Sequence, residues 1–262
     1  MEPFSIKICS DLHINSYFPN YPSVKNLFNT TEPFIADICI LVGDTTHYEL
    51  IHFYKKFLKY LSTYFTRIVL VPGNHEYYNN TTNNIKSMKE MDLLASSLTD
   101  EIKNLDILNN TYIDIMNIRI YGSILWSFIP DNVPYNKYIP IYNDYKKLIT
   151  KEEFNMLNYC SKLSLVNCIE QTKKDGKQLI IATHYSPTFD MYTILNDTTL
   201  VPSDPLNYFY CNNLNHLINN KNAAVWVFGH THTFINEIKD GCILLSNPYT
   251  KDYVPGLGIT IN

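Results

Sequence analysis

The sequence predicts an α/β fold, in which buried strands alternate with helices that pack on the sheet. Two apolar, β-branched runs, Ile38–Val42 and Ile68–Val71, are continuous rather than alternating, which is typical of strands buried on both faces. Between them, the apolar residues of Tyr48–Phe65 follow the i, i+3, i+4, i+7 spacing of an amphipathic helix. A strand, a helix and a second strand in this order form a right-handed βαβ crossover.

Further elements follow along the chain. We expect a helix at Lys86–Leu98 and another at Lys151–Thr172, where Thr150 and the acidic residues after it predict a capped first turn. Two segments rich in Pro and Tyr, residues 127–145 and 185–210, look irregular and follow strands that end in polar motifs, so both are candidate lids. The remaining strand-like runs are Phe4–Cys9, Tyr112–Met116, Ile118–Leu125, Gln178–Ala182, Ala224–Phe228, Phe234–Ile238 and Cys242–Leu245.

Composition limits the classes of protein. At 262 residues and 45% hydrophobic, with no domain-splitting linker, residues 1–262 are expected to form a single domain around a substantial core. The net charge of −4, with Arg67 and Arg119 as the two arginines, disfavours tight binding to duplex nucleic acid, which depends on many Lys/Arg–phosphate contacts. No apolar run approaches the roughly 20 residues that span a bilayer. Scattered cysteines and the lack of a secretory signal predict reduced thiols and a cytoplasmic (intracellular) location.

Five polar motifs follow apolar runs and contain five of the eight histidines. Because parallel strands deliver functional groups at their carboxyl ends, such motifs can converge on one crevice. A site for two divalent ions needs oxygen and imidazole ligands, and one carboxylate can bridge both ions. The motifs that supply this set are Asp11-Leu12-His13, Gly43-Asp44, Gly73-Asn74-His75-Glu76, Thr183-His184 and Gly229-His230-Thr231-His232.

Each motif taken alone also has a structural interpretation. A lone histidine is more often a hydrogen-bonded core residue than a ligand, and an Asp-x-His or Gly-Asp pair is common by chance. Gly-Asn-His-Glu and Gly-His-x-His are more specific, and all five motifs in order, each ending a strand, favour a metal site. His52 and His216 lie in expected helices outside the motifs, so the structural interpretation is preferred for both.

The order and spacing of the motifs closely resemble the calcineurin-like metallophosphoesterase superfamily. The resemblance implies a four-layer α/β/β/α sandwich of two mixed sheets, with the site at the carboxyl ends of the motif strands. It also implies which residues bind metal. The first ion would be held by Asp11, His13 and His232, the second by Asn74, His184 and His230, and Asp44 would bridge both.

The resemblance gives His75 a different role. In the family the corresponding histidine faces the substrate, so His75 is the expected catalytic residue, stabilising phosphoryl oxygens or protonating the leaving group. Its neighbour Glu76 is a candidate for orienting it. His47 stands near the position where many family members carry a second acidic residue, so the role of that acid is not carried over to this chain.

Further motifs resemble a small branch of bacterial and viral members of this superfamily. Gly122–Trp126 matches its Gly-x-x-Leu-Trp strand end, and Asn143–Tyr145 matches its Asn-Asp-Tyr segment. The branch closes with Asn-Pro-Arg-Gly-Tyr, whereas this chain has Asn-Pro-Tyr-Thr and lacks the arginine, which could bind a phosphate. For Trp126 and Tyr249, packing at the edge of the core explains the residue as well as a functional role does.

The implied reaction is hydrolysis of a phosphate mono- or diester, in which a hydroxide bridging two divalent ions attacks phosphorus. Mixed nitrogen and oxygen ligands favour Mn, Fe or Zn, with Mg as a further candidate. The segments rich in Pro and Tyr predict an aromatic rim, which favours a small, nucleotide-like phosphorylated substrate over a DNA duplex. The alternatives are a nuclease acting on DNA and a catalytically inactive metal-binding scaffold for protein partners. The oligomeric state is left open.

Overall fold

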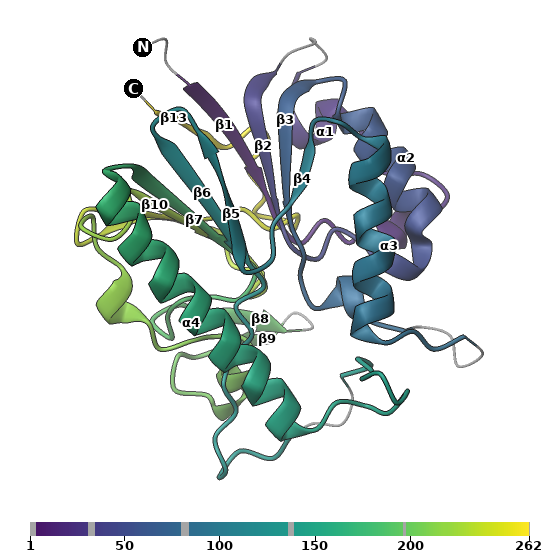
Figure 1. The fold of residues 1–262 in the computed structure, drawn as a ribbon, viewed down its shortest axis with the longest axis vertical. Coiled ribbons are helices and arrows are strands. Elements are labelled where there is room, and N and C mark those ends of the chain that lie inside the picture. The colour runs from purple at the N-terminus through teal and green to yellow at the C-terminus, as the bar shows by residue number, and fades with distance from the viewer. Residues whose placement is uncertain (1–3, 31–34, 80–83, 136–138, 196–197, 262) are drawn as a thin grey trace.

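The computed structural model describes residues 4–30, 35–79, 84–135, 139–195 and 198–261. Figure 1 shows two sheets that lie face to face, with helices outside them. In the first sheet β1 to β4 are parallel, and β13 at the edge is antiparallel to β1. Its order is β13 (Gly258–Ile261), β1 (Phe4–Cys9), β2 (Ala36–Val42), β3 (Phe65–Val71) and β4 (Leu105–Ile107).

The second sheet is also mixed. Its four inner strands are parallel, and the edge strands β11 and β5 are antiparallel to their neighbours. Its order is β11 (Ile235–Lys239), β12 (Cys242–Ser246), β10 (Val225–Phe228), β7 (Gln178–Thr183), β6 (Ile118–Ser123) and β5 (Thr111–Ile115). The predicted pair of mixed sheets is therefore confirmed.

Three apolar clusters separate the layers. Helices α1 (Val24–Phe28), α2 (Ile51–Leu61) and α3 (Met88–Glu101) pack on the outer face of the first sheet. The long helix α4 (Lys151–Asp175) packs on the outer face of the second sheet. Between the sheets, isoleucines and valines from both inner faces form a third cluster. These clusters confirm the four-layer α/β/β/α sandwich.

Local sequence signals fix the helix starts. Ser87 caps α3 and Thr150 caps α4, each in a capping box with a glutamate three residues later. The predicted helix Tyr48–Phe65 is too long at both ends. A 3-10 turn, Tyr48–Leu50, precedes α2. Phe65 is already the first residue of β3, where it pairs with Ala36 and packs its ring 5.0 Å from that of Phe28.

The segment 185–210, predicted to be irregular, contains a hairpin of β8 (Thr193–Leu195) and β9 (Thr198–Leu200) and a 3-10 helix, Pro205–Phe209. The prediction was wrong there because these strands are too short to show alternation. The hairpin is anchored beside a predicted ligand loop, since the N–H of Ile194 donates to the carbonyl of Thr231 at 2.8 Å. His216 lies in a 3-10 turn rather than a longer helix.

Candidate metal centre

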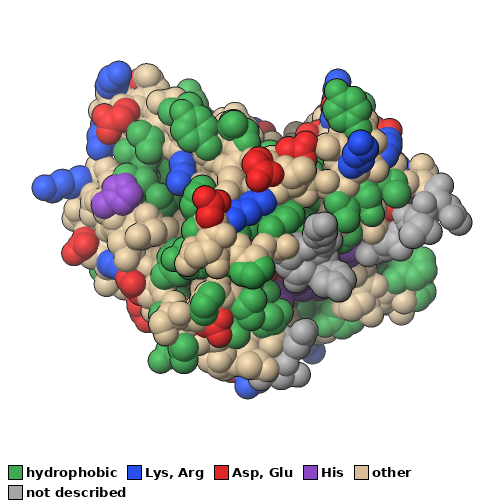
Figure 2. Space-filling model, turned by 90° about the horizontal axis from the view of Figure 1, so that it is seen from below, with side chains coloured by type: hydrophobic (Ala, Val, Ile, Leu, Met, Phe, Trp, Pro, Cys, Tyr) green, Lys and Arg blue, Asp and Glu red, His purple; other side chains and the backbone are tan. Residues whose placement is uncertain are grey.

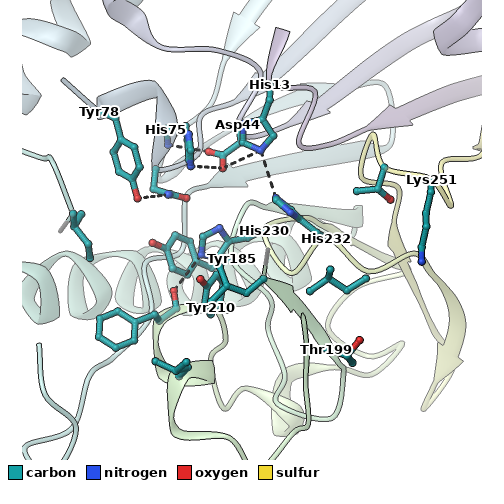
Figure 3. A pocket seen from close by; sticks show the side chains of 17 residues that line it. His13, Asp44, His75, Tyr78, Tyr185, Thr199, Tyr210, His230, His232 and Lys251 are labelled. Carbon is teal, nitrogen blue, oxygen red and sulfur yellow. Dashed lines mark hydrogen bonds and ion pairs between the residues drawn. The ribbon is translucent and has the colours of Figure 1, made fainter. Parts of the chain in front are cut away.

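The five motifs meet at one end of the sandwich, where parallel strands of both sheets terminate. Figure 3 shows His13, Asp44, His75, His230 and His232 there. The site therefore joins the two sheets rather than belonging to one of them. In chain order, the predicted site residues are Asp11 and His13 after β1, Asp44 after β2, Asn74 and His75 after β3, His184 after β7, and His230 and His232 after β10.

Left-handed backbone conformations turn many of these side chains into the site. Such φ values are uncommon outside glycine and cost about 1–3 kcal/mol each, so their concentration here marks a functional region. Gly43 also has a positive φ, 76°, and a side chain at this position would collide with the His184 ring. The predicted ligands with positive φ are Asp11 (52°), His13 (41°), Asp44 (51°), His230 (67°) and His232 (55°).

The first predicted ligand group, Asp11, His13 and His232, is brought together. Nε2 of His232 lies 3.5 Å from Oδ1 of Asp11 and 3.4 Å from Nε2 of His13. Asp11 is buried, and its carboxylate accepts the backbone N–H of His230 at 3.0 Å from Oδ1. This bond ties the end of β1 in the first sheet to the end of β10 in the second.

The second predicted group surrounds His184, which is fully buried. Its Nε2 lies 3.2 Å from Oδ1 of Asp44 and 2.9 Å from Oδ1 of Asn74. Its Nδ1 lies 3.2 Å from the carbonyl of Val42, which can accept that N–H and so direct Nε2 at the site. Nε2 of His230 similarly faces the carbonyl of Phe209 at 3.1 Å, which leaves Nδ1 of His230 for an ion.

Asp44 stands between the two groups. Its Oδ1 faces His184 and accepts the backbone N–H of His75 at 2.9 Å. Its Oδ2 lies 3.9 Å from Nε2 of His13 and 3.8 Å from Nε2 of His75. One carboxylate therefore presents a different oxygen to each side, which is the arrangement a bridging ligand requires.

His75 faces the open side of the site, with 34% of its side chain exposed. Its ring lies between those of His13 and Tyr78, at centroid distances of 4.7 and 4.4 Å. His47, which the sequence left without a role, packs against the same ring at 5.6 Å. The location suits a group that meets substrate, although His75 also lies close enough to His13 and Asp44 to share an ion with them.

Glu76 joins two of the ligand loops. It is fully buried, and its carboxylate accepts the backbone N–H groups of Gly73, Asp44 and Thr45 at 2.8 to 3.0 Å. It also accepts the hydroxyl of Tyr54 at 3.1 Å. Burial and the nearby Asp44 raise the pKa of Glu76 to about 7. Adjacency to His75 suggested an effect on that ring, but the contacts of Glu76 hold the loops after β2 and β3 together.

The electrostatics of the cluster centre on Asp44. Burial alone would raise its pKa, but the surrounding imidazoles, His184 foremost, hold it well below its usual range. Burial would lower the pKa of His184, but the Asp44 carboxylate outweighs this and raises it to about 9. Burial lowers the pKa of His13 and His75, and lowers that of His230 strongly. At neutral pH, an incoming ion must therefore displace a proton from His184.

A pocket of about 880 Å³ opens above these residues. The segment 185–210 supplies much of its wall, including Tyr185, Phe209 and Tyr210, whereas 127–145 contributes Ile139 among the described residues. Lys251 is the one lysine or arginine in the described lining, opposite Tyr78 in Figure 3. Figure 2 views this end of the molecule and shows dark purple histidine atoms in a hollow near its centre, with hydrophobic side chains beside them.

Two further sequence features have packing roles. Trp126 is buried, with its ring 5.5 Å from Phe154 and 5.6 Å from Tyr185. Through Tyr185 it supports the pocket wall without lining the pocket. Tyr249 packs against Tyr17 and Tyr253 at the edge of the first core cluster. Both side chains therefore pack in or at the edge of the core, as one of the two interpretations of the sequence predicted.

The donor set fits the binding of divalent ions. Within each of three groups the ligand atoms lie within 4.8 Å of one another, and the middle group shares members with both others. The approach of Nε2 of His13 to Nε2 of His232 also fits, because a cation between them can take both lone pairs. The groups are Asp11–His13–His232, His13–Asp44–His75 and Asp44–His184–His230.

The fold and the site define a metal-binding α/β/β/α sandwich, and comparison with known proteins gives its family. The model of the calcineurin-like phosphoesterases matches residues 4–234, so the chain belongs to this family of metal-dependent phosphoric ester hydrolases. Uncharacterized protein L509 of Acanthamoeba polyphaga mimivirus is 31% identical over 208 residues, which cover 74% of this chain and 71% of that protein.

Two solved structures share the fold at low identity. A phosphopantetheinyl hydrolase (PptH) from Mycobacterium tuberculosis superposes with a TM-score of 0.70 at 17% identity, covering 98% of this chain and 95% of that one. TT1561 of Thermus thermophilus gives a TM-score of 0.53 at 12% identity, covering 94% and 89%. None of the helices in the described part of the chain has the length and hydropathy that crossing a membrane requires.

Proposed function

We propose that the protein hydrolyses a phosphate mono- or diester with the help of two divalent ions. When bound, these ions supply positive charge to the phosphoryl oxygens and lower the pKa of coordinated water. Mn, Fe or Zn suit the mixed nitrogen and oxygen donors best, with Mg as a further candidate. The first ion is assigned to Asp11, His13 and His232, the second to Asn74, His184 and His230, and Asp44 is assigned to both.

The observation that carries the proposal is the orientation of Asp44. Its two oxygens face different donor groups, and its backbone is held by Glu76 and by a left-handed φ of 51°. A structural aspartate would need one partner for its charge, whereas this one has three imidazoles around it. The arrangement supports a shared ligand between two ions more strongly than a single-ion site.

His75 is the proposed catalytic residue. Because burial lowers its pKa, the free imidazole is largely neutral at pH 7 and donates one N–H to a phosphoryl oxygen. A substrate phosphate beside the ring adds negative charge, which raises that pKa again. The ring can then take up a proton from solvent and give it to the leaving oxygen, which returns the imidazole to its neutral form. Its contacts with His13 and Tyr78 hold it toward the pocket.

The pocket wall supports a small ester with a flat or apolar group. Tyr210 and Phe209 lie on one side, and Ile194 and Leu195 of the β8–β9 hairpin add an apolar surface. Stacking on an aromatic side chain is worth roughly 1–3 kcal/mol per base, so a nucleotide-like substrate suits this wall. The same crowding disfavours a DNA duplex.

The six cysteines are free thiols, which supports the proposed intracellular location.

The test is a screen of turnover with each metal added back to metal-free protein. Aryl phosphates, cyclic nucleotides, dinucleotides, a phosphopantetheinyl ester, single-stranded DNA and duplex DNA cover the proposed class and the nuclease alternative. We expect metal-dependent hydrolysis of small esters. Faster cleavage of DNA than of any small ester would favour a nuclease, and no turnover of any compound would favour an inactive scaffold.

Replacing His75 separates catalysis from metal binding. His75→Ala should keep the bound metal while kcat on an alkyl ester falls by roughly 10²–10⁴, the usual size of an acid–base contribution. The matched control is His52→Ala, an exposed histidine of α2 outside the site, which should change neither. Loss of metal from His75→Ala would instead make this residue a ligand.

A further inference from the structure

The carboxamide of Asn74 lies in the site with a defined orientation. Oδ1 lies 2.9 Å from Nε2 of His184, on the side of the second ligand group, and Nδ2 donates to the hydroxyl of Tyr78 at 2.7 Å (Figure 3). Asn74 is only 3% exposed. Because a cation binds the oxygen and not the NH₂ group of an amide, a reversed Asn74 could not serve as a ligand.

Tyr78 is itself held in place by its surroundings. It follows the 3-10 turn His75–Tyr77, so the chain reverses and returns its side chain to Asn74. Its ring lies 4.4 Å from the ring of His75 at an interplanar angle of 34°. Its backbone carbonyl faces Nδ1 of His47 at 3.5 Å. These contacts fix the position of the hydroxyl relative to Asn74.

We propose that Tyr78 is a positioning residue, which holds the Asn74 amide with its oxygen toward the second ion. The inference rests on the proposed metal centre. Without the hydroxyl, the buried NH₂ of Asn74 has no acceptor among the described residues when Oδ1 faces the site. The rotamer of Asn74 with its NH₂ group toward the ion then competes with the rotamer that has its oxygen toward the ion. Partners that orient metal ligands typically change metal affinity by about 10–100-fold.

The first experiment measures Mn²⁺ affinity without substrate, by calorimetric titration of metal-free protein. Tyr78→Phe keeps a ring beside His75 and removes the hydroxyl, so the affinity for one of the two Mn²⁺ ions should fall by about tenfold. The matched control is Tyr77→Phe. The Tyr77 hydroxyl is buried in the same turn but donates to Asp92 at 2.6 Å, so its loss should leave Mn²⁺ affinity unchanged.

A second background isolates the orientation of the amide. In Asn74→Asp both side-chain oxygens can bind an ion, so the orientation no longer matters and the effect of Tyr78→Phe on Mn²⁺ affinity should disappear. An equal loss in both backgrounds would show that Tyr78 acts through packing, and no loss with Asn74 present would also overturn the proposal.

The same titrations separate this inference from the proposed function. If the affinity pattern holds but no ester is hydrolysed, the positioning role stands and the proposed activity fails. If the wild-type protein binds none of Mn²⁺, Fe²⁺, Zn²⁺ and Mg²⁺, both are refuted.

Discussion

Gly43 offers a sharp test of how tightly the site is built. It precedes Asp44 and has a left-handed φ of 76°. A Cβ at this position would lie 2.1 Å from Nδ1 and 2.4 Å from Cγ of His184, well inside van der Waals contact. His184 is fully buried and bonded on both nitrogens, so its ring cannot simply move aside.

The expected effect of Gly43→Ala has two parts. The left-handed conformation costs an alanine about 1–2 kcal/mol. Forcing a methyl group into a filled space costs a further 1–3 kcal/mol or so. The sum predicts a loss of roughly 2–5 kcal/mol of unfolding free energy, together with a loss of metal affinity because the His184 ring is displaced.

Gly176 provides the matched control. It ends α4 with a φ of 65°, and a Cβ there would meet no atom within 4 Å. Gly176→Ala should therefore show the backbone cost alone and leave Mn²⁺ affinity unchanged. Urea unfolding of the metal-free variants gives the stability difference, and calorimetric titration gives the affinity. The reasoning is refuted if Gly43→Ala is no less stable than Gly176→Ala and binds Mn²⁺ as well as wild type.

Two further predictions concern the metals themselves. Asp44→Ala should lose more bound metal than any other single ligand substitution, because one carboxylate serves both groups; elemental analysis after dialysis checks this against Asp11→Ala. Since the pKa of His184 is raised to about 9, Mn²⁺ binding at pH 7 should release about one proton from this residue and strengthen as pH rises toward 9. Titration in buffers of different ionisation enthalpy measures that release, and buffer-independent heats would contradict it. In the metal-free protein the same raised pKa stabilises the fold fully below pH 6.5, and this contribution is lost as pH rises through about 9.

The positions of the candidate ligands were predictable because their chemistry and their place after apolar runs are both visible in sequence. The burial of β2 and β3 on both faces, for example, makes their apolar runs continuous and their ends abrupt. Asp44 and His184 are distant in sequence, and their contact follows from the parallel arrangement of strands whose ends coincide. The metal-binding roles of these residues and the catalytic role of His75 depended on resemblance and stay predictions.

Other parts of the site had no local signal. The contacts of Glu76 with Asp44 and Thr45 depend on how the loops after β2 and β3 lie in space. The position of Glu76 next to His75 in the sequence therefore did not predict its contacts. Tyr78 is one of 21 tyrosines, and nothing in the sequence singles it out. The strands β4 and β13 are too short for periodicity to show, and their place comes from pairing with longer strands.

The division of the site between two sheets also sets an order for its assembly. Asp11 and Asp44 are synthesised early, but their partners His184 and His230 come more than a hundred residues later. A growing polypeptide therefore carries four of the seven candidate ligands before the other three have been synthesised. Retention of ions should begin only after residue 232 has left the ribosome and the second sheet has docked on the first. Metal occupancy would then be a measure of whether the two sheets have docked.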